Sequence, residues 1–280
     1  MLRCFFVSDL HGKTDHYEKL FHLILKEKPD IIFLGGDLLP HSFIQKNFAA
    51  DFLLPNLQTL KTNMLDKYPR MFLVLGNDDA RIEEPSILEL EKQSLIEYIH
   101  FRKTNFLEFD IYGYAFTPPS PFLLKDWEKY DVSRFVDPGS ISPEEGKRTV
   151  DISINETKYS TIKDDLDALT KDDDLSKAIF LFHGPPYQTK LDRAALDGKM
   201  IDHIPVDAHV GSIAIKRFIE KKQPLITLHG HIHESARISG SWKDKIGRTF
   251  CFSAAHDGSE LAIVKFELGN PETAERILLN

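Results

Sequence analysis

Residues 225–233 read LITLHGHIH, an apolar run followed at once by three histidines that alternate with glycine and isoleucine. A short continuous apolar run is typical of a strand that is buried on both faces. Imidazole is the commonest metal ligand among protein side chains. The segment therefore predicts a buried strand that delivers nitrogen ligands at its carboxyl end.

The chain contains several other apolar runs of the same form, at residues 2–7, 31–34, 71–75 and 178–182. Between some of them, apolar residues recur at helical spacing. One such stretch contains Tyr17, Leu20 and Ile24, and another covers residues 43–65 with an interruption at Pro55. Strands that alternate with helices and are apolar throughout indicate an α/β protein whose central strands are covered on both faces.

Three regions differ from this pattern. Residues 108–114 alternate in polarity, which predicts a half-exposed strand, and residues 250–253 and 261–266 predict an antiparallel finish to the fold. Residues 116–147 are rich in proline, glycine, aromatic and charged residues. We expect an excursion over the surface there, either a lid near the site or an ordinary structured insertion. Because no linker or internal repeat is evident, we expect residues 1–280 to form a single domain that carries this insertion.

The composition narrows the class of protein. Of the 280 residues, 42% are hydrophobic and 28% charged, which is typical of a soluble globular protein. A net charge of -8 disfavours extended binding to nucleic acid but is compatible with a small phosphate ester at a local metal site. The two cysteines, Cys4 and Cys251, are too few for a disulfide framework or a thiolate metal site. Without a leader or a membrane-length apolar run, we expect a cytoplasmic protein with no membrane partner.

Polar residues that can bind metals follow each apolar run. In an open α/β sheet, ligand sites lie at the carboxyl ends of the strands. We therefore expect one cluster there, made of two carboxylates, one carboxamide and four imidazoles, from Asp9, His11, Asp37, Asn77, His183, His231 and His233. Such a mixed set suits Mn, Fe, Zn or Ni better than Mg or Ca. Seven ligands are too many for one ion but suffice for two if a carboxylate bridges them, and two ions about 3.5–4 Å apart form the usual clamp for displacement at phosphorus.

The chain resembles the calcineurin-like metallophosphoesterases in five blocks that occur in the family order and span residues 9–233. They are Asp9-Leu10-His11, Gly36-Asp37, Gly76-Asn77, His183 and Gly230-His231-Ile232-His233. More narrowly, it is similar to the Icc-related predicted phosphoesterase branch in His183-Gly184-Pro185-Pro186, Leu191-Asp192, His209-Val210-Gly211-Ser212 and residues 229–235. The resemblance implies an α/β fold in the form of a four-layer αββα sandwich, two mixed β-sheets flanked by helices.

The resemblance also implies roles for the ligands and a reaction. The first metal ion would be held by Asp9, His11 and His233, the second by Asn77, His183 and His231, and both by the bridging Asp37. Two divalent ions are implied, with manganese expected and iron, zinc or nickel as alternatives. The implied reaction is hydrolysis of a small phosphodiester or phosphomonoester by a metal-bridging hydroxide, without a covalent enzyme intermediate.

One residue departs from the family pattern. Asp78 stands where the family usually has a histidine that assists the leaving group. A carboxyl group can act as an acid only if its pKa is raised, and two nearby cations favour the opposite shift. Asp78 and His256 are therefore the alternative candidates for the acid, unless the substrate has a good leaving group. Asn77 and Tyr187 are the candidates for contact with the substrate, and His229 is expected to have a packing role.

Three other functions compete with a phosphoesterase of small substrates. A nuclease of the same family would need a basic groove, which the acidic composition disfavours. A catalytically weak or non-catalytic regulatory protein that binds metal or phosphate is favoured only by Asp78. A metal-dependent amidohydrolase on a (β/α)₈ barrel is remote, because Asp9-Leu10-His11 does not match its usual pair of histidines. The oligomeric state stays open, with a homodimer as one alternative.

Overall fold

The apolar runs of the sequence form the central strands of two six-stranded sheets. The computed structural model describes residues 2–41 and 47–280. In the first sheet the order is β14-β13-β1-β2-β3-β4, and β1 to β4 are parallel. The strand bounds are Arg3–Val7 (β1), Ile31–Gly35 (β2), Arg70–Val74 (β3), Glu97–Tyr98 (β4), Leu261–Glu267 (β13) and Asn270–Leu279 (β14).

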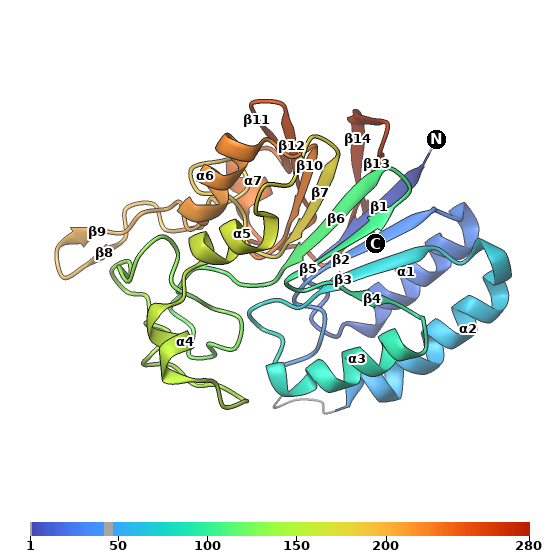
Figure 1. The fold of residues 1–280 in the computed structure, drawn as a ribbon, viewed down its shortest axis with the longest axis horizontal. Coiled ribbons are helices and arrows are strands. Elements are labelled where there is room, and N and C mark those ends of the chain that lie inside the picture. The colour runs from blue at the N-terminus through green and yellow to red at the C-terminus, as the bar shows by residue number, and fades with distance from the viewer. Residues whose placement is uncertain (1, 42–46) are drawn as a thin grey trace.

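The second sheet has the order β11-β12-β10-β7-β6-β5, with β6, β7, β10 and β12 parallel to one another. Its strands are Arg102–Phe106 (β5), Phe109–Tyr114 (β6), Ala178–Phe182 (β7), Ile226–His229 (β10), Lys243–Ile246 (β11) and Thr249–Ser253 (β12). A separate two-stranded hairpin, Met200–Ile201 (β8) and Ile204–Pro205 (β9), projects away from both sheets (Figure 1).

Helices flank both sheets (Figure 1). Beside the first sheet lie Thr14–Glu27 (α1), Leu54–Met64 (α2) and Glu84–Lys92 (α3), and beside the second lie Ile162–Thr170 (α5), Ile213–Lys222 (α6) and Ser235–Ser239 (α7). The short helix Ile154–Tyr159 (α4) lies next to the segment 116–147. This is the arrangement of two mixed sheets between helices that the resemblance implies. No helix in residues 2–41 and 47–280 combines the length and apolar composition needed to cross a bilayer.

Aromatic side chains in register make up much of the core. Phe6 lies opposite Phe33 and Phe33 opposite Phe72 across β1, β2 and β3. The rings of Phe33 and Phe72 stack with centroids 5.6 Å apart. In the second sheet, the rings of Tyr112 and Phe180 stack at 4.6 Å. Since these strands are buried along their length, the continuous apolar runs are explained by the helices and the second sheet that cover them.

Several sequence-based expectations differ from the structure. The half-exposed strand predicted at residues 108–114 is wrong, because β6 lies between β5 and β7 and is almost entirely buried. The antiparallel finish is confirmed for β13, which is antiparallel to β1, and in part for β12, which is antiparallel to β11 but parallel to β10. Of the helix predicted over residues 43–65, residues 43–46 lie outside the described residues. Pro55 does not end the helix; it lies in the first turn of α2, where the π-helical stretch Ala49–Leu53 changes to an α-helix.

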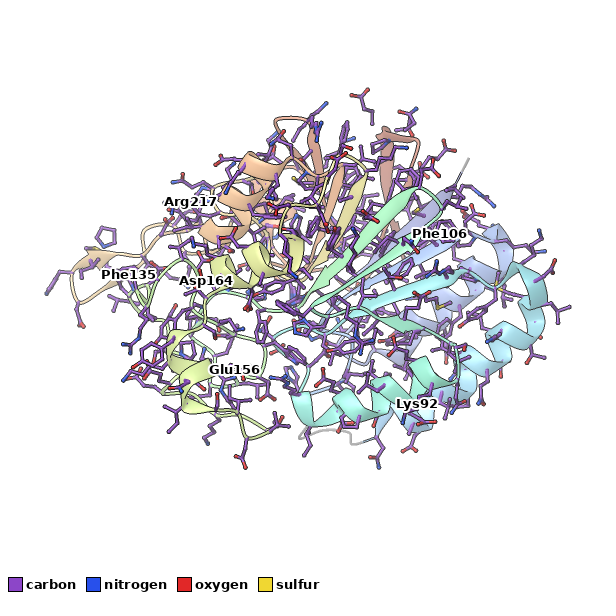
Figure 2. The ribbon with its side chains drawn as sticks, viewed as in Figure 1. Lys92, Phe106, Phe135, Glu156, Asp164 and Arg217 are labelled. Carbon is purple, nitrogen blue, oxygen red and sulfur yellow. The ribbon has the colours of Figure 1, made fainter. Side chains whose placement is uncertain are left out.

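The segment 116–147 contains no helix or strand of its own and is held by isolated bridges such as Leu124–Lys147. Its middle is deeply buried, with Trp127 and Asp126 both 0% exposed. The Asp131 carboxylate accepts hydrogen bonds from the backbone of Ile213 and Ala214 and so caps α6. Outer residues such as Phe135 project from the surface (Figure 2). The excursion is therefore anchored in the core at its centre.

A buried ion pair lies at this anchor. The side chains of Lys125 and Glu128 are both 0% exposed and pair with each other. Lys125 also donates to the Ser120 carbonyl at 2.9 Å, and Glu128 accepts from the Ser120 backbone N–H at 2.8 Å. Burial lowers the pKa of Lys125 and raises the pKa of Glu128, although the pairing opposes both shifts. Each charge is thus tolerated inside the protein only because the other is present.

We predict that Glu128→Ala lowers the free energy of unfolding by about 3–5 kcal/mol, because it leaves the Lys125 ammonium buried without a partner. Urea denaturation followed by circular dichroism measures the change. Glu89→Ala removes one partner of the exposed pair Lys92–Glu89 and is the matched control, with an unchanged urea midpoint expected. A stable Glu128→Ala variant would show that the ion pair is not the anchor.

Candidate metal centre

The carboxyl ends of β1, β2, β3, β7 and β10 meet where the two sheets approach each other, and their loops bring the predicted ligands together. Three groups of side chains in the described residues have potential ligand atoms within 4.8 Å of one another; one is His11, His41 and Asp78, and the other two consist of predicted ligands alone. These two are Asp9, His11, Asp37 and His233, and Asp37, His183 and His231. Asp37 belongs to both groups and lies between them.

His183 links the two sheets at this point. Its Nδ1 donates to the Gly35 carbonyl, at the end of β2, at 2.9 Å. Because this bond holds the proton on Nδ1, the unprotonated form of the ring would present Nε2 as a ligand atom. Nε2 lies 2.9 Å from Oδ1 of Asn77 and 3.3 Å from Oδ2 of Asp37. Asn77 therefore adds an amide oxygen to the second group.

Four of the predicted ligands have left-handed backbone conformations, with φ of 57° at Asp9, 45° at His11, 53° at Asp37 and 75° at His231. Such conformations cost on the order of 1–3 kcal/mol each in a residue other than glycine, and they cluster at functional sites. Hydrogen bonds between the loops hold them in place: the Asp9 N–H donates to the Gly36 carbonyl at 2.9 Å, and the His11 N–H to the Asp37 carbonyl at 2.8 Å. Four candidate ligands on neighbouring loops thus share an uncommon backbone conformation that these hydrogen bonds maintain.

Two glycines make the close approach of these loops feasible. At Gly36, which has φ of 87°, a Cβ atom would lie 2.5 Å from Nδ1 of His183 and 2.9 Å from Cα of Gly76. At Gly76, a Cβ atom would collide with the Asp37 carboxylate. Any larger residue would push apart the groups that converge on Asp37.

The charges at the centre balance in pairs. Burial opposes ionisation of Asp37, but His183 beside it keeps the pKa of this carboxyl well below its usual range. Burial also disfavours a charged His183, yet Asp37 raises the pKa of His183 to about 10. In the same way, Asp9 raises the pKa of His233 to about 9 against the effect of burial. Protons on His183 and His233 thus neutralise the two buried carboxylates in the metal-free protein.

The remaining histidine of the centre behaves differently. Burial, together with the positive charge of His183, lowers the pKa of His231 to about 3. This ring is therefore neutral at physiological pH, as a metal ligand must be. Its backbone N–H donates to Oδ1 of Asp9 at 3.0 Å. The donor set of carboxylates, an amide oxygen and imidazoles is of the kind that could hold divalent metal ions.

Asp78 lies next to the centre and faces a residue that the sequence did not point to. Its backbone N–H donates to Oδ1 of Asp37 at 2.8 Å, and its Oδ2 lies 3.6 Å from Nδ1 of His11. His41 Nε2 lies 3.9 Å from the same Oδ2, and the ring of His41 stacks on that of His11 at 6.0 Å. The available signal was that His41 follows Asp37 by four residues, in the loop after β2.

Two other predicted site residues have partners elsewhere. The Tyr187 hydroxyl donates to Asp207 at 2.6 Å, and His256 Nε2 lies 3.1 Å from a carboxylate oxygen of Glu260. Neither belongs to the groups of potential metal ligands in the described chain. Their predicted roles in substrate binding and acid catalysis remain predictions.

His229 has the packing environment expected for it. Its Nδ1 donates to the Gly184 carbonyl at 2.9 Å, and its Nε2 accepts from the Thr227 hydroxyl at 2.8 Å. The ring stacks on Phe182, with centroids 5.6 Å apart. Burial lowers the pKa of His229 to about 4, so the ring is neutral. His229 thereby holds the residue that directly follows His183.

The model of the calcineurin-like phosphoesterase family matches residues 2–235. The chain belongs to this family. Members of the calcineurin-like phosphoesterase family use divalent metal ions, in agreement with the Asp and His groups at the strand ends. No curated protein matches the chain closely enough to refine this assignment.

Solved structures share the fold of this calcineurin-like phosphoesterase at low sequence identity. The protein TT1561 of Thermus thermophilus has a TM-score of 0.57 at 17% identity, with 99% of each chain covered. A dimetal phosphatase from Danio rerio has a TM-score of 0.52 at 12% identity, with 94% of this chain and 91% of that chain covered. At such identities the likeness concerns the fold.

We predict that Mn²⁺ binding to the metal-free phosphoesterase at pH 7 releases about two protons, because His183 and His233 are protonated there and must be neutral as ligands. The affinity for Mn²⁺ accordingly rises with pH up to about pH 9–10. Titration calorimetry in buffers of different ionisation enthalpy counts the protons. His233→Ala should reduce the count by about one. Metal binding without proton release would contradict the charge pairing.

Proposed function

We propose that this calcineurin-like phosphoesterase hydrolyses a small phosphate ester at a centre of two divalent ions and prefers a phosphodiester to a phosphomonoester. The observation that carries the proposal is the shared Asp37, which belongs to both groups of potential ligands. The first ion is assigned to Asp9, His11 and His233 with Asp37, and the second to Asn77, His183 and His231 with Asp37. Manganese is the proposed metal, because the mixed donor set suits borderline ions.

When bound, two such ions acidify a water molecule and neutralise the charge of the phosphoryl oxygens. The chain's own residues supply the geometry. The Asp78 N–H fixes the Asp37 carboxylate, and the Gly35 carbonyl fixes the His183 ring. Both orienting bonds come from the backbone of adjacent strand-end loops. The donors are therefore preorganised before a substrate arrives.

The preference for a diester rests on the Asp78 carboxylate. It lies beside the centre and its side chain is 28% exposed, so a bound substrate meets it. Burial and the charge of Asp37 raise the pKa of Asp78 in the metal-free protein, whereas divalent cations beside it favour its ionised form. A phosphomonoester dianion carries one more negative charge than a diester and is repelled more strongly. The open side of the centre at Asp78 and His41 therefore favours a singly charged phosphate.

We predict that chelator-stripped protein regains hydrolysis of bis(p-nitrophenyl) phosphate as Mn²⁺ is added back. Asp37→Asn should lower kcat/KM by more than about a hundredfold. Mutation of a residue that only hydrogen-bonds to a metal ligand typically costs about 10–100-fold, and loss of a ligand shared by both ions should cost more. The matched control is Asp167→Asn, an exposed carboxylate on α5, with unchanged activity expected. Tight Mn²⁺ binding without hydrolysis of any phosphate ester would instead indicate a regulatory metal- or phosphate-binding protein.

We further predict that Asp78→Asn reduces the diester preference. The ratio of kcat/KM for bis(p-nitrophenyl) phosphate to that for p-nitrophenyl phosphate should fall by about tenfold, equivalent to removing about 1.4 kcal/mol of repulsion. Steady-state kinetics on the two substrates, at the same Mn²⁺ concentration, measures the ratio. An unchanged ratio would remove the electrostatic basis of the preference.

A further inference from the structure

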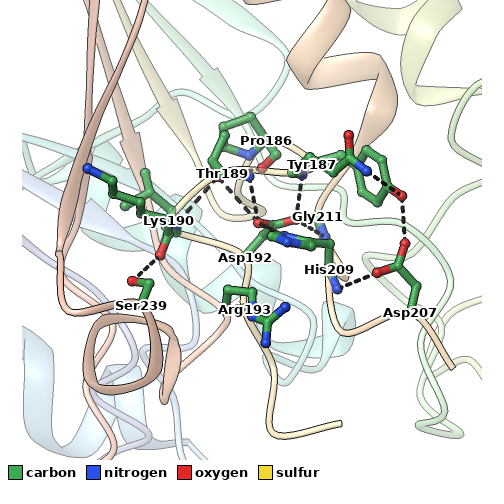
Figure 3. A network of polar contacts seen from close by, with 12 residues as sticks. Pro186, Tyr187, Thr189, Lys190, Asp192, Arg193, Asp207, His209, Gly211 and Ser239 are labelled. Carbon is green, nitrogen blue, oxygen red and sulfur yellow. Dashed lines mark hydrogen bonds and ion pairs between the residues drawn. The ribbon is translucent and has the colours of Figure 1, made fainter. Parts of the chain in front are cut away.

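The segment 184–212, which joins β7 to α6, is organised around one buried carboxylate. Asp192 is 0% exposed, and it accepts hydrogen bonds from the backbone N–H groups of Gln188 and Thr189 at 2.9 Å each and of Gly211 at 3.2 Å (Figure 3). A Cβ atom on Gly211 would lie 2.8 Å from Cβ of Asp192. The two ends of the segment are thus packed tightly against each other at this carboxylate.

One further donor to Asp192 is an imidazole. His209 Nδ1 lies 2.8 Å from Oδ1 of Asp192, and the His209 side chain is 26% exposed. The bond to the carboxylate holds a proton on Nδ1, so Nε2 is the ring atom left for another partner. Within residues 2–41 and 47–280, no hydrogen bond involves this Nε2. Asp207 accepts from the His209 backbone N–H at 2.8 Å and so fixes the backbone at this residue.

This segment is tied to the flanks of two metal-binding loops. Two residues after His183, the Pro185 carbonyl accepts from the Ser212 N–H at 2.8 Å. Glu234, which directly follows His233, accepts from the Ala195 N–H at 3.0 Å. The short ribbon that carries Ala195 also pairs Arg193 with His209. His209 therefore lies on a segment whose two ends are tied next to His183 and His233.

A purely structural role does not require this arrangement. The Asp192 carboxylate already ties the segment together through three backbone N–H groups, none of which needs a titratable ring. A ring that is held on one nitrogen by a buried carboxylate and open on the other has the form of a general acid or base. The rings of Tyr187 and His209 meet edge to face, with centroids 6.2 Å apart.

We propose that His209, oriented by Asp192, donates its Nε2 proton to the leaving-group oxygen of a phosphodiester bound at the metal centre. A hydroxide ion forms the new P–O bond as the P–O bond to the leaving group breaks; the electron pair of the broken bond goes to the leaving oxygen, which takes the proton and departs as an alcohol. The imidazolium becomes a neutral ring that keeps its Nδ1 proton on Asp192. This role rests on the proposed function, and it identifies the substrate class as diesters of alcohols that are poor leaving groups.

The test compares leaving groups. His209→Asn is the decisive variant, because its amide N–H can still donate to Asp192 but cannot give a proton to the leaving oxygen. With Mn²⁺ bound, kcat for methyl phenyl phosphate should fall by about 10²-fold or more, and kcat for methyl p-nitrophenyl phosphate should change little, since p-nitrophenolate leaves without a proton. His203→Ala, in the turn between β8 and β9, is the matched control and should leave both rates unchanged.

The pH profile provides a second readout. In the wild type, kcat for methyl phenyl phosphate should fall at high pH as the acid loses its proton, and this limb should be absent in His209→Asn. Equal losses on both substrates would overturn the proposal. The proposal would also be overturned if His41→Ala lowered kcat for methyl phenyl phosphate alone while His209→Asn lowered neither rate. A wild type without activity would overturn the proposed function itself. An active wild type, with equal losses of kcat on both substrates in His209→Asn, would overturn only the role of His209.

Proximity to the metal is measured independently of activity. Mn²⁺ is paramagnetic, so the NMR signals of histidine rings near the centre broaden when it binds. We expect the signals of His209 to broaden strongly and those of His203, on the projecting hairpin (Figure 1), to broaden much less. Equal broadening of the two, or sharp His209 signals with bound Mn²⁺, would overturn the placement of His209 at the centre.

Discussion

The burial of two carboxylates, Asp9 and Asp37, is the constraint on which the rest of the site depends. They are 8% and 2% exposed, and ionised carboxylates at such depth are stable only with compensating positive charge. His183 and His233 supply it, each within 3.3 Å of a carboxylate oxygen. Either protons on these rings or divalent cations would supply the positive charge that the two carboxylates require. The charge balance of the core is therefore suited to the exchange of protons for metal ions.

The fold satisfies this constraint through the ends of its strands. Parallel strands of the first sheet bring Asp9, Asp37 and Asn77 to one edge, and β7 and β10 of the second sheet bring the histidines to the same place. The loops accept left-handed backbone at four ligand positions and exclude Cβ atoms at Gly36 and Gly76. Packing of two sheets against each other provides the stability that such strained loops require.

Two long connections, segments 116–147 and 184–212, are also held in place by buried charges that are paired. The segment 116–147 is anchored by the buried pair Lys125–Glu128, and the segment 184–212 is anchored by the buried carboxylate of Asp192. In each, a charge that would be costly inside the protein is fully paired by groups of the same segment. Irregular chain thereby gains a defined position, which is what a substrate-binding wall requires.

The sequence by itself determined the central strands and the candidate ligand types, because a strand buried on both faces must be apolar throughout and its end is recognisable by the polar residue that follows. It also determined the family, since five weak blocks in a fixed order are specific together. Only the tertiary structure decided the burial of β6, which depends on its neighbours β5 and β7 rather than on its own alternation. The approach of His41 to Asp78 and of His209 to Asp192 was likewise decided by folding, because contacts between separate loops depend on backbone paths that local residue patterns do not specify.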